Sequence, residues 1–155
     1  MPPLEVSSHV LVNADADRVW QLAMDWSRQR EWIWGTKVSG GAAVGAQVLA
    51  RTAIGPVGFD DTMVITEWDP PRRCVVRHTG KVVRGLGVFE VVPHGLVSEF
   101  RWTEQLDLPL SSAGSLGRWV VDPVGRWVVV PLTRIGLSSS LRRFARLVER
   151  PAVTL

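Results

Sequence analysis

Residues 97–106 read Val-Ser-Glu-Phe-Arg-Trp-Thr-Glu-Gln-Leu, and this stretch decides the fold class. Successive side chains of a β-strand point to opposite faces, so Phe100, Trp102 and Glu104 share one face and Arg101 lies on the other. One apolar and one polar face are typical of an antiparallel strand that covers a core on one side. The pattern predicts a half-buried strand and places the Glu104 carboxyl group on its apolar face.

The same strand pattern extends upstream to Thr36. Runs of valine, threonine and aromatic residues alternate there with turn-forming residues. The predicted turns are Gly40-Gly41, Gly55-Pro56, Asp69-Pro70-Pro71, Gly80-Lys81 and His94-Gly95. These signals predict about six consecutive antiparallel strands between Thr36 and Leu108.

Two of these strands supply further inward-facing residues. Alternation over residues 73–79 separates an apolar face from a face that carries Arg77, and alternation over residues 85–91 leaves Glu90 outside. The inward positions are Cys74, Val76, His78, Gly85, Gly87, Phe89 and Val91. Inward glycines remove side-chain volume and ease strong bending of a sheet.

The segments before the strand-rich region predict one further strand and two short helices. Residues 4–12 alternate as a half-buried strand that leaves His9 in solvent. Asp15 offers a capping oxygen before a helical apolar spacing over residues 16–24, and a second short helix is predicted at about residues 28–33.

The C-terminal segment is predicted to be helical. In residues 138–149 an apolar stripe that includes Leu141 and Phe144 lies opposite several arginines. Pro123 and Pro131 precede this stripe, and each is expected to interrupt the helix, so we expect a broken helical run. The fold class is therefore α+β: a curved antiparallel sheet of about seven strands around a long C-terminal helix, with two short helices after the first strand.

Composition limits what the chain can be. With 155 residues and 46% hydrophobic residues, we expect one domain spanning residues 1–155. A single cysteine, Cys74, excludes an internal disulfide, and the three histidines show no metal-binding spacing, so no metal and no cofactor are expected. Neither a signal peptide nor a membrane-spanning stretch is visible, which favours a cytoplasmic location.

The aromatic residues are unusual. The chain has eight tryptophans, four phenylalanines and no tyrosine. The tryptophans are spread along the chain, which is typical either of a tryptophan-rich core or of the wall of a large apolar cavity.

The C-terminal segment is also cationic, because residues 118–150 hold seven of the sixteen arginines and only two acidic residues. Three interpretations stay open: a solvated helix face, contact with an anionic membrane surface assisted by Trp119 and Trp127, and nucleic-acid binding. The solvated face is favoured, membrane contact comes second and no nucleic acid is expected.

Several motifs in this order resemble the START-like, helix-grip superfamily, which includes bacterial polyketide cyclases/dehydrases and lipid-transfer domains. The motifs are Ala16-Asp17-Arg18-Val19-Trp20, Asp25-Trp26, Glu31-Trp32, Glu67-Trp68-Asp69-Pro70-Pro71-Arg72-Arg73, Phe89-Glu90-Val91-Val92-Pro93 and Ser98-Glu99-Phe100-Arg101-Trp102-Thr103-Glu104. The resemblance spans nearly the whole chain. It implies a deep apolar cavity between sheet and helix, suited to lipids, sterols, polyketides or quinones, and it does not by itself imply catalysis.

The alternation of side chains between the two faces of each predicted strand selects the candidate site residues. His78 and Glu104 are the candidates for acid–base catalysis, because imidazole transfers protons near neutral pH and a carboxyl beside Trp102 is partly desolvated. The candidate ligand-binding residues are Trp34, Cys74, Val76, Gly87, Phe89, Phe100 and Trp102.

Each polar candidate also has a structural interpretation. His78 can be a core histidine, Glu104 a strand-end carboxylate paired with an arginine, and Asp60-Asp61 a turn or strand start. Cys74 is interpreted as a small buried apolar residue.

The leading hypothesis is a protein that binds, and can transport, a hydrophobic small molecule in an internal cavity. The alternative is a polyketide aromatase/cyclase or dehydratase that uses His78 or Glu104. A third possibility, a module that binds a protein partner, requires an exposed apolar patch.

Overall fold

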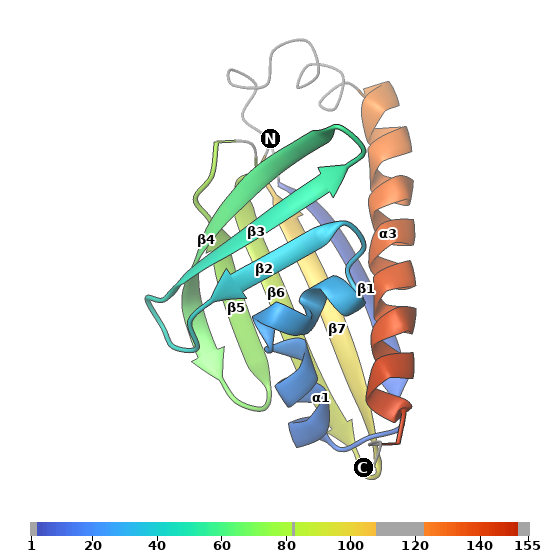
Figure 1. The fold of residues 1–155 in the computed structure, drawn as a ribbon. Coiled ribbons are helices and arrows are strands. Elements are labelled where there is room, and N and C mark those ends of the chain that lie inside the picture. Colours follow the sequence, from blue (N-terminus) through green and yellow to red (C-terminus); the bar gives the residue numbers. More distant parts are fainter. Residues whose placement is uncertain (1–2, 82, 108–122, 152–155) are drawn as a thin grey trace.

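The computed structural model describes residues 3–81, 83–107 and 123–151. Within these residues, seven strands form one sheet and three helices lie on its inner side (Figure 1). The strands are β1 (Leu4–Val12), β2 (Thr36–Gly40), β3 (Gln47–Ile54), β4 (Val57–Asp69), β5 (Arg73–His78), β6 (Gly85–His94) and β7 (Val97–Leu106). The helices are α1 (Ala16–Ala23), the 3-10 helix η1 (Trp26–Glu31) and α3 (Pro123–Glu149).

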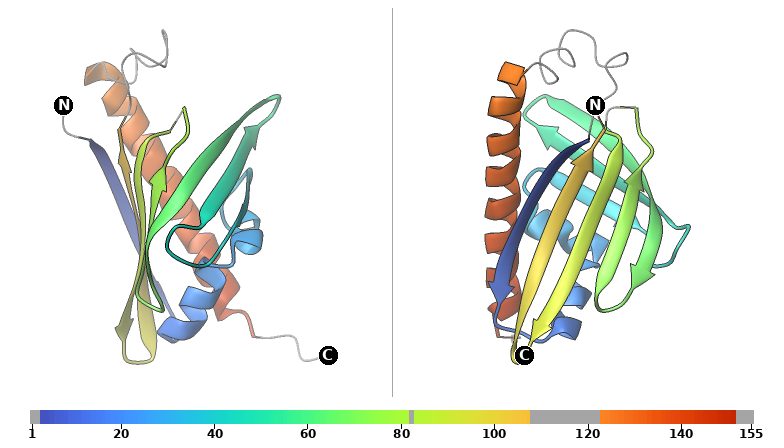
Figure 2. Two further views of the ribbon diagram at one scale, coloured as in Figure 1. Left: turned by 90° about the vertical axis from the view of Figure 1, so that its left-hand side faces the viewer. Right: turned by 180° about the vertical axis from the view of Figure 1, so that it is seen from behind.

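The sheet has the order β1-β7-β6-β5-β4-β3-β2, and every neighbouring pair that it contains is antiparallel. From β2 to β7 each strand pairs with the next one in sequence, whereas β1 pairs with β7, with Leu4 opposite Leu106. Figure 2 shows that the sheet curls strongly and that α3 runs along its concave side. The predicted α+β helix-grip architecture is confirmed, including the two short helices after the first strand.

The short helices form where the sequence predicts them. Asp15 caps α1, because its side-chain Oδ1 accepts the backbone N–H of Arg18 over 2.9 Å. The helix η1 begins two residues earlier than predicted and ends before Trp32, whose side chain is completely buried.

The helix α3 differs from the prediction of a broken helical run. Pro123 occupies its first position, where proline is favoured because no intrahelical N–H bond is needed there. Pro131 lies inside the helix, and the helix continues through it to Glu149. The Pro131 side chain is exposed, so water can hydrate the backbone carbonyl that loses its partner. The prediction of an interruption at Pro131 was therefore wrong.

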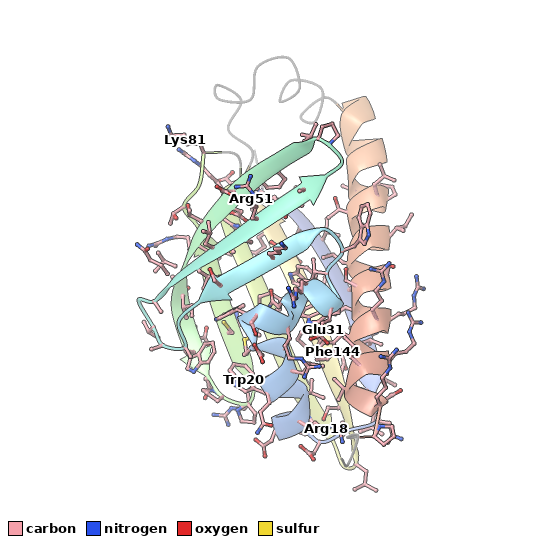
Figure 3. The ribbon with its side chains drawn as sticks, in the orientation of Figure 1. Arg18, Trp20, Glu31, Arg51, Lys81 and Phe144 are labelled. Carbon is pink, nitrogen blue, oxygen red and sulfur yellow. The ribbon has the colours of Figure 1, made fainter. Side chains whose placement is uncertain are left out.

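Aromatic side chains join α3 to the sheet. Phe144 is completely buried and projects from α3 toward the interior (Figure 3). Its ring lies 4.5 Å from that of Phe100 on β7 and 5.1 Å from that of Trp32. Edge-to-face and tilted arrangements of this kind stabilise beyond the apolar area they bury. This cluster fixes the C-terminal half of α3 on the concave face.

The tryptophans are divided between core and surface. Trp20, Trp26 and Trp32 are buried, whereas Trp34 is 66% exposed. Trp119 lies outside the described residues. Along the part of the chain that the structure describes, no helix combines the length and the apolar character needed to cross a membrane.

Candidate functional site

A cavity of about 160 Å³ lies between η1 and the inner face of the sheet. Its walls come from η1, from the residue Ile33 that follows it closely and from the six strands β2 to β7. The lining residues are Trp26, Gln29, Ile33, Thr36, Val38, Ala50, Thr52, Asp61, Met63, Val76, His78, Phe89, Trp102 and Glu104. Aromatic and aliphatic side chains thus surround a small number of polar groups, a composition typical of small-molecule sites, in a cavity smaller than the about 300 to 1,000 Å³ of most of them.

His78 is the centre of the polar part of this cavity. It is the last residue of β5 and is 8% exposed. Its Nδ1 lies 2.8 Å from Oδ2 and 3.0 Å from Oδ1 of Asp61 on β4, and its Nε2 lies 3.2 Å from Oε2 of Glu104 on β7. Since an ionised carboxylate only accepts hydrogen bonds, both ring nitrogens donate, and the imidazole is in its doubly protonated form.

The surroundings of His78 shift its pKa. Burial of the ring acts to lower the pKa, but the hydrogen bonds and negative charges of Asp61 and Glu104 outweigh burial and raise the pKa to about 9. The imidazole is therefore mostly protonated at neutral pH. It forms a charged, buried cluster with the two carboxylates.

Glycine on β6 lets His78 and Glu104 meet across an intervening strand. Gly85 pairs with His78, and Gly87 pairs with Glu104. A Cβ atom on Gly87 would lie 3.3 Å from Oε1 and 3.6 Å from Oε2 of Glu104. The absence of a side chain there leaves the space that the Glu104 carboxylate occupies.

Trp102 fixes the other side of the Glu104 carboxylate. Its indole Nε1 donates to Oε1 of Glu104 over 2.6 Å, and its ring stacks on Phe89 with centroids 5.5 Å apart. One residue therefore supplies both an apolar wall and an orienting hydrogen bond.

The structure places most of the predicted site residues at or beside the cavity. The residues Val76, His78, Phe89, Trp102 and Glu104 line it. Cys74 and Phe100 are completely buried on the same face of the sheet but are not among the lining residues, and Gly87 lies beside Glu104. Burial raises the pKa of the Cys74 thiol to about 12, with a smaller contribution from the charge of Glu67, so the thiol stays protonated at neutral pH.

Trp34 is misplaced by the sequence prediction. It was expected in the apolar wall, yet its side chain is 66% exposed. The following residue, Gly35, has a φ of +68°, and this left-handed turn redirects the chain between η1 and β2. Local spacing alone does not predict such a turn.

Asp61 is the polar residue that the sequence interpretation missed. The pair Asp60-Asp61 was interpreted as a turn or strand start, but both residues lie within β4. Asp61 is 9% exposed and shares the inner face with Met63 and Ile65, whereas the Asp60 side chain is 51% exposed. Extending the alternation of Ile65 and Met63 upstream would have placed Asp61 inward.

Glu104 has different partners from the one suggested by its structural interpretation. It pairs with His78 and Trp102 and not with an arginine, so that interpretation was wrong.

The described residues contain no group of three or more histidine, cysteine, aspartate or glutamate side chains with a geometry that could hold a metal ion. The polar cluster is a hydrogen-bonded chain in which Asp61, His78, Glu104 and Trp102 follow one another.

The expected cavity between the sheet and the long helix is displaced, because none of the described lining residues belongs to α3. These features define a class of protein: a helix-grip domain in which a curved sheet packs against a long helix and encloses, together with the short helix η1, a cavity with an ionisable cluster. The chain belongs to the polyketide cyclase / dehydrase and lipid transport family, whose family model matches residues 3–149. Among curated proteins, none matches the chain by sequence.

Solved structures share the fold at low sequence identity. The protein TTHA0849 from Thermus thermophilus has 18% identity and a TM-score of 0.74, and the match covers 94% of this chain and 97% of that one. The Zhui aromatase/cyclase from Streptomyces sp. R1128 has 18% identity and a TM-score of 0.74, covering 95% of this chain and 94% of that one. The polyketide-cyclase-like protein Cgl2372 from Corynebacterium glutamicum has 16% identity and a TM-score of 0.65, covering 96% and 94%.

Proposed function

We propose that the protein binds a hydrophobic small molecule, such as a lipid, polyketide, sterol or quinone, and that it can carry this ligand. The cavity of about 160 Å³ between η1 and the sheet would receive a ring-sized part of the ligand. The observation that supports the proposal is a cavity with mainly apolar and aromatic walls and one buried polar cluster. Such a site gains affinity from apolar burial and orientation from its few polar groups.

The first test identifies what the protein holds. The purified chain is extracted with organic solvent, and the extract is analysed by mass spectrometry for a stoichiometric small molecule. Candidate ligands are then added back while tryptophan fluorescence is followed, because Trp26 and Trp102 line the cavity. An empty extract with no fluorescence response to any of the four ligand classes would contradict the proposal.

A matched pair of variants locates binding. Ala50 on β3 lines the cavity, whereas Ala53 on the same strand is exposed. Ala50→Leu fills part of the cavity and is expected to weaken binding about tenfold or more, whereas Ala53→Leu is expected to bind like the unchanged protein. Equal binding by both variants would place the ligand elsewhere.

A polyketide aromatase/cyclase or dehydratase is the second candidate function, and the chain of Asp61, His78 and Glu104 favours it. In an aldol closure, a base removes a proton from the carbon between two carbonyls, and an acid protonates the carbonyl oxygen that this carbon attacks. Dehydration then removes a second carbon-bound proton and releases the protonated hydroxyl as water. In this candidate Glu104 takes the proton from carbon and the His78 imidazolium gives its proton to the oxygen. The proton on Glu104 then returns to His78 across their 3.2 Å contact, which restores the base and the acid for the same exchange in the dehydration.

Turnover separates the two functions. A poly-β-keto substrate is incubated with the protein and with the variants His78→Ala and Glu104→Ala, and the products are separated by chromatography. Turnover that disappears in both variants supports the enzyme, whereas tight binding of the substrate without turnover supports the carrier.

We also propose that α3 contacts anionic membrane surfaces transiently. Arg134, Arg142 and Arg146 are exposed on α3, and the exposed Leu132 and Ile135 lie close to Arg134 in sequence. Co-sedimentation with vesicles that contain phosphatidylserine, compared with phosphatidylcholine vesicles, tests this contact. Equal recovery with both kinds of vesicle would count against it.

A further inference from the structure

The cavity has few hydrogen-bond donors left for a ligand. The Nε1 of Trp26 donates to the backbone carbonyl of Gly41 over 2.8 Å, and the Nε1 of Trp102 donates to Glu104. Both ring nitrogens of His78 are held by carboxylates. One N–H of the Gln29 side chain donates to the Ala23 carbonyl over 3.0 Å.

The two threonine hydroxyls in the cavity wall are largely committed as well. The Thr36 hydroxyl lies 3.0 Å from the Thr52 hydroxyl and 3.4 Å from the Trp34 carbonyl. Either threonine can donate in the 3.0 Å pair, so at most one of the two hydroxyl hydrogens is left for a ligand. The fully buried Trp32 retains an unpaired Nε1–H, but Trp32 is not among the lining residues.

Acceptors remain in excess. A carboxylate has about four lone-pair positions, whereas Glu104 receives two hydrogen bonds and Asp61 receives those of one ring nitrogen. One imidazolium between two carboxylates leaves the cluster with excess negative charge. The described lining residues include no arginine and no lysine.

We infer that the ligand presents a hydrogen-bond donor, an O–H or N–H group on an apolar body, to the carboxylates of Asp61 and Glu104, and that the cavity rejects free carboxylates. This inference rests on the proposed binding function and narrows its ligand class. A donor fills the open lone pairs of the cluster. An anionic head group would meet negative charge without a basic partner, and burying such a charge is costly.

Three ligands with the same ring system test the inference on the full-length protein at pH 7 by isothermal titration calorimetry. They are 2-naphthol, which donates; 2-methoxynaphthalene, which only accepts; and 2-naphthoate, which is anionic. We expect 2-naphthol to bind at least about tenfold more tightly than 2-methoxynaphthalene, as a hydrogen bond to a charged group predicts, and 2-naphthoate to bind most weakly.

Variants connect this preference to the cluster. Glu104→Gln keeps the shape of the side chain but removes its charge, so the preference for 2-naphthol over 2-methoxynaphthalene is expected to fall to within about threefold. Glu90→Gln is the control, because Glu90 lies on the neighbouring strand β6 and pairs outside the cavity with Arg73. It is expected to keep the full preference. Circular dichroism confirms that both variants are folded.

The outcomes separate this inference from the proposed function. If 2-methoxynaphthalene or 2-naphthoate binds as tightly as 2-naphthol, the donor requirement is wrong while the cavity function stands. If Glu104→Gln keeps the preference, the cluster is not its source and the inference fails. If none of the three ligands binds, both the proposed function and the inference are contradicted.

Discussion

The indole Nε1 of Trp102 lies 2.6 Å from Oε1 of Glu104, and the two residues are next neighbours on the inner face of β7. Because His78 holds the other carboxylate oxygen, the plane of the Glu104 carboxylate is fixed from two sides. One face of a single strand thus carries both the aromatic wall and the charged group of the cavity.

Trp102→Phe removes this donor and keeps an aromatic ring. We expect a loss of about 2 to 3 kcal/mol in the free energy of unfolding, because Glu104 loses a hydrogen bond to a charged group and the ring becomes smaller. Urea denaturation measures the change. Trp34→Phe is the matched control, since Trp34 is 66% exposed, and it is expected to change stability by less than about 0.5 kcal/mol.

The raised pKa of His78 predicts how stability depends on pH. The folded pKa of about 9 lies above the ordinary value of 6.5, so the stabilising contribution is complete below pH 6.5 and is lost as the pH rises through 9. The loss is on the order of 3 kcal/mol. Urea denaturation between pH 6 and 10 measures it, and NMR follows the imidazole directly. His78→Gln should flatten the profile in this range, and a wild-type stability that rises from pH 6.5 to 9 would contradict the assignment.

Asp61 and Asp60 form a matched pair of neighbouring carboxylates with different roles. Asp61→Asn replaces a charged acceptor of His78 with a neutral one, so the pKa of His78 should fall and the free energy of unfolding should decrease by about 1 to 3 kcal/mol. Asp60 is half-exposed and pairs with Arg51 over 3.2 Å, so Asp60→Asn is expected to cost less than about 1 kcal/mol. NMR titration of the imidazole measures the pKa of His78, and urea denaturation measures the free energy of unfolding. A similar His78 titration in the two variants would refute the role of Asp61.

Phe144 anchors α3, and its removal tests the docking of that helix. Phe144→Ala leaves a cavity between Trp32 and Phe100 and is expected to cost about 3 to 5 kcal/mol. Ile135→Ala, on the same helix at 61% exposure, should cost less than about 1 kcal/mol. Thermal unfolding followed by circular dichroism ranks the two, and equal melting temperatures would show that α3 is not packed as described.

Two glycines should respond in opposite directions to the same substitution. Gly85 has a φ of +123°, and an added Cβ would clash with the carbonyl oxygen of Gln105, so Gly85→Ala is expected to disrupt the end of the β6–β7 pairing and to destabilise strongly. Around Gly136 in α3, nothing lies within 4 Å of an added Cβ, so Gly136→Ala should stabilise by about 0.5 to 1 kcal/mol. Melting temperatures of the two variants measure both effects. A stabilised Gly85→Ala would contradict the close approach of β6 and β7.

The sequence predicted those parts of the fold that depend on local alternation. The alternation of side chains along each strand was enough to place His78 and Glu104 on the inner face, and both line the cavity. Alternation cannot show that the two side chains meet across β6, because this contact depends on the register of β5, β6 and β7 and on Gly87. Asp61 was missed because an acidic pair at the start of a strand resembles a turn until the length of β4 is known.

Other parts of the site depend on tertiary packing. Gln29, Thr36 and Thr52 enter the cavity wall because η1 lies against the sheet edge formed by β2 and β3, and no periodicity reports that placement. Pro131 shows the same limit: proline predicts an interruption, but an exposed helical position tolerates it when water can replace the missing bond.

The pairing of β1 with β7 also determines when the protein can fold during its synthesis. Residues 4–12 are synthesised well before their partner strand, which ends at Leu106, so β1 has no sheet to join until β7 has been made. The apolar inner face is covered later still, because Phe144, which packs on Trp32 and Phe100, follows β7 in the sequence. The core of this domain can therefore form only after the segment that carries Phe144 has left the ribosome.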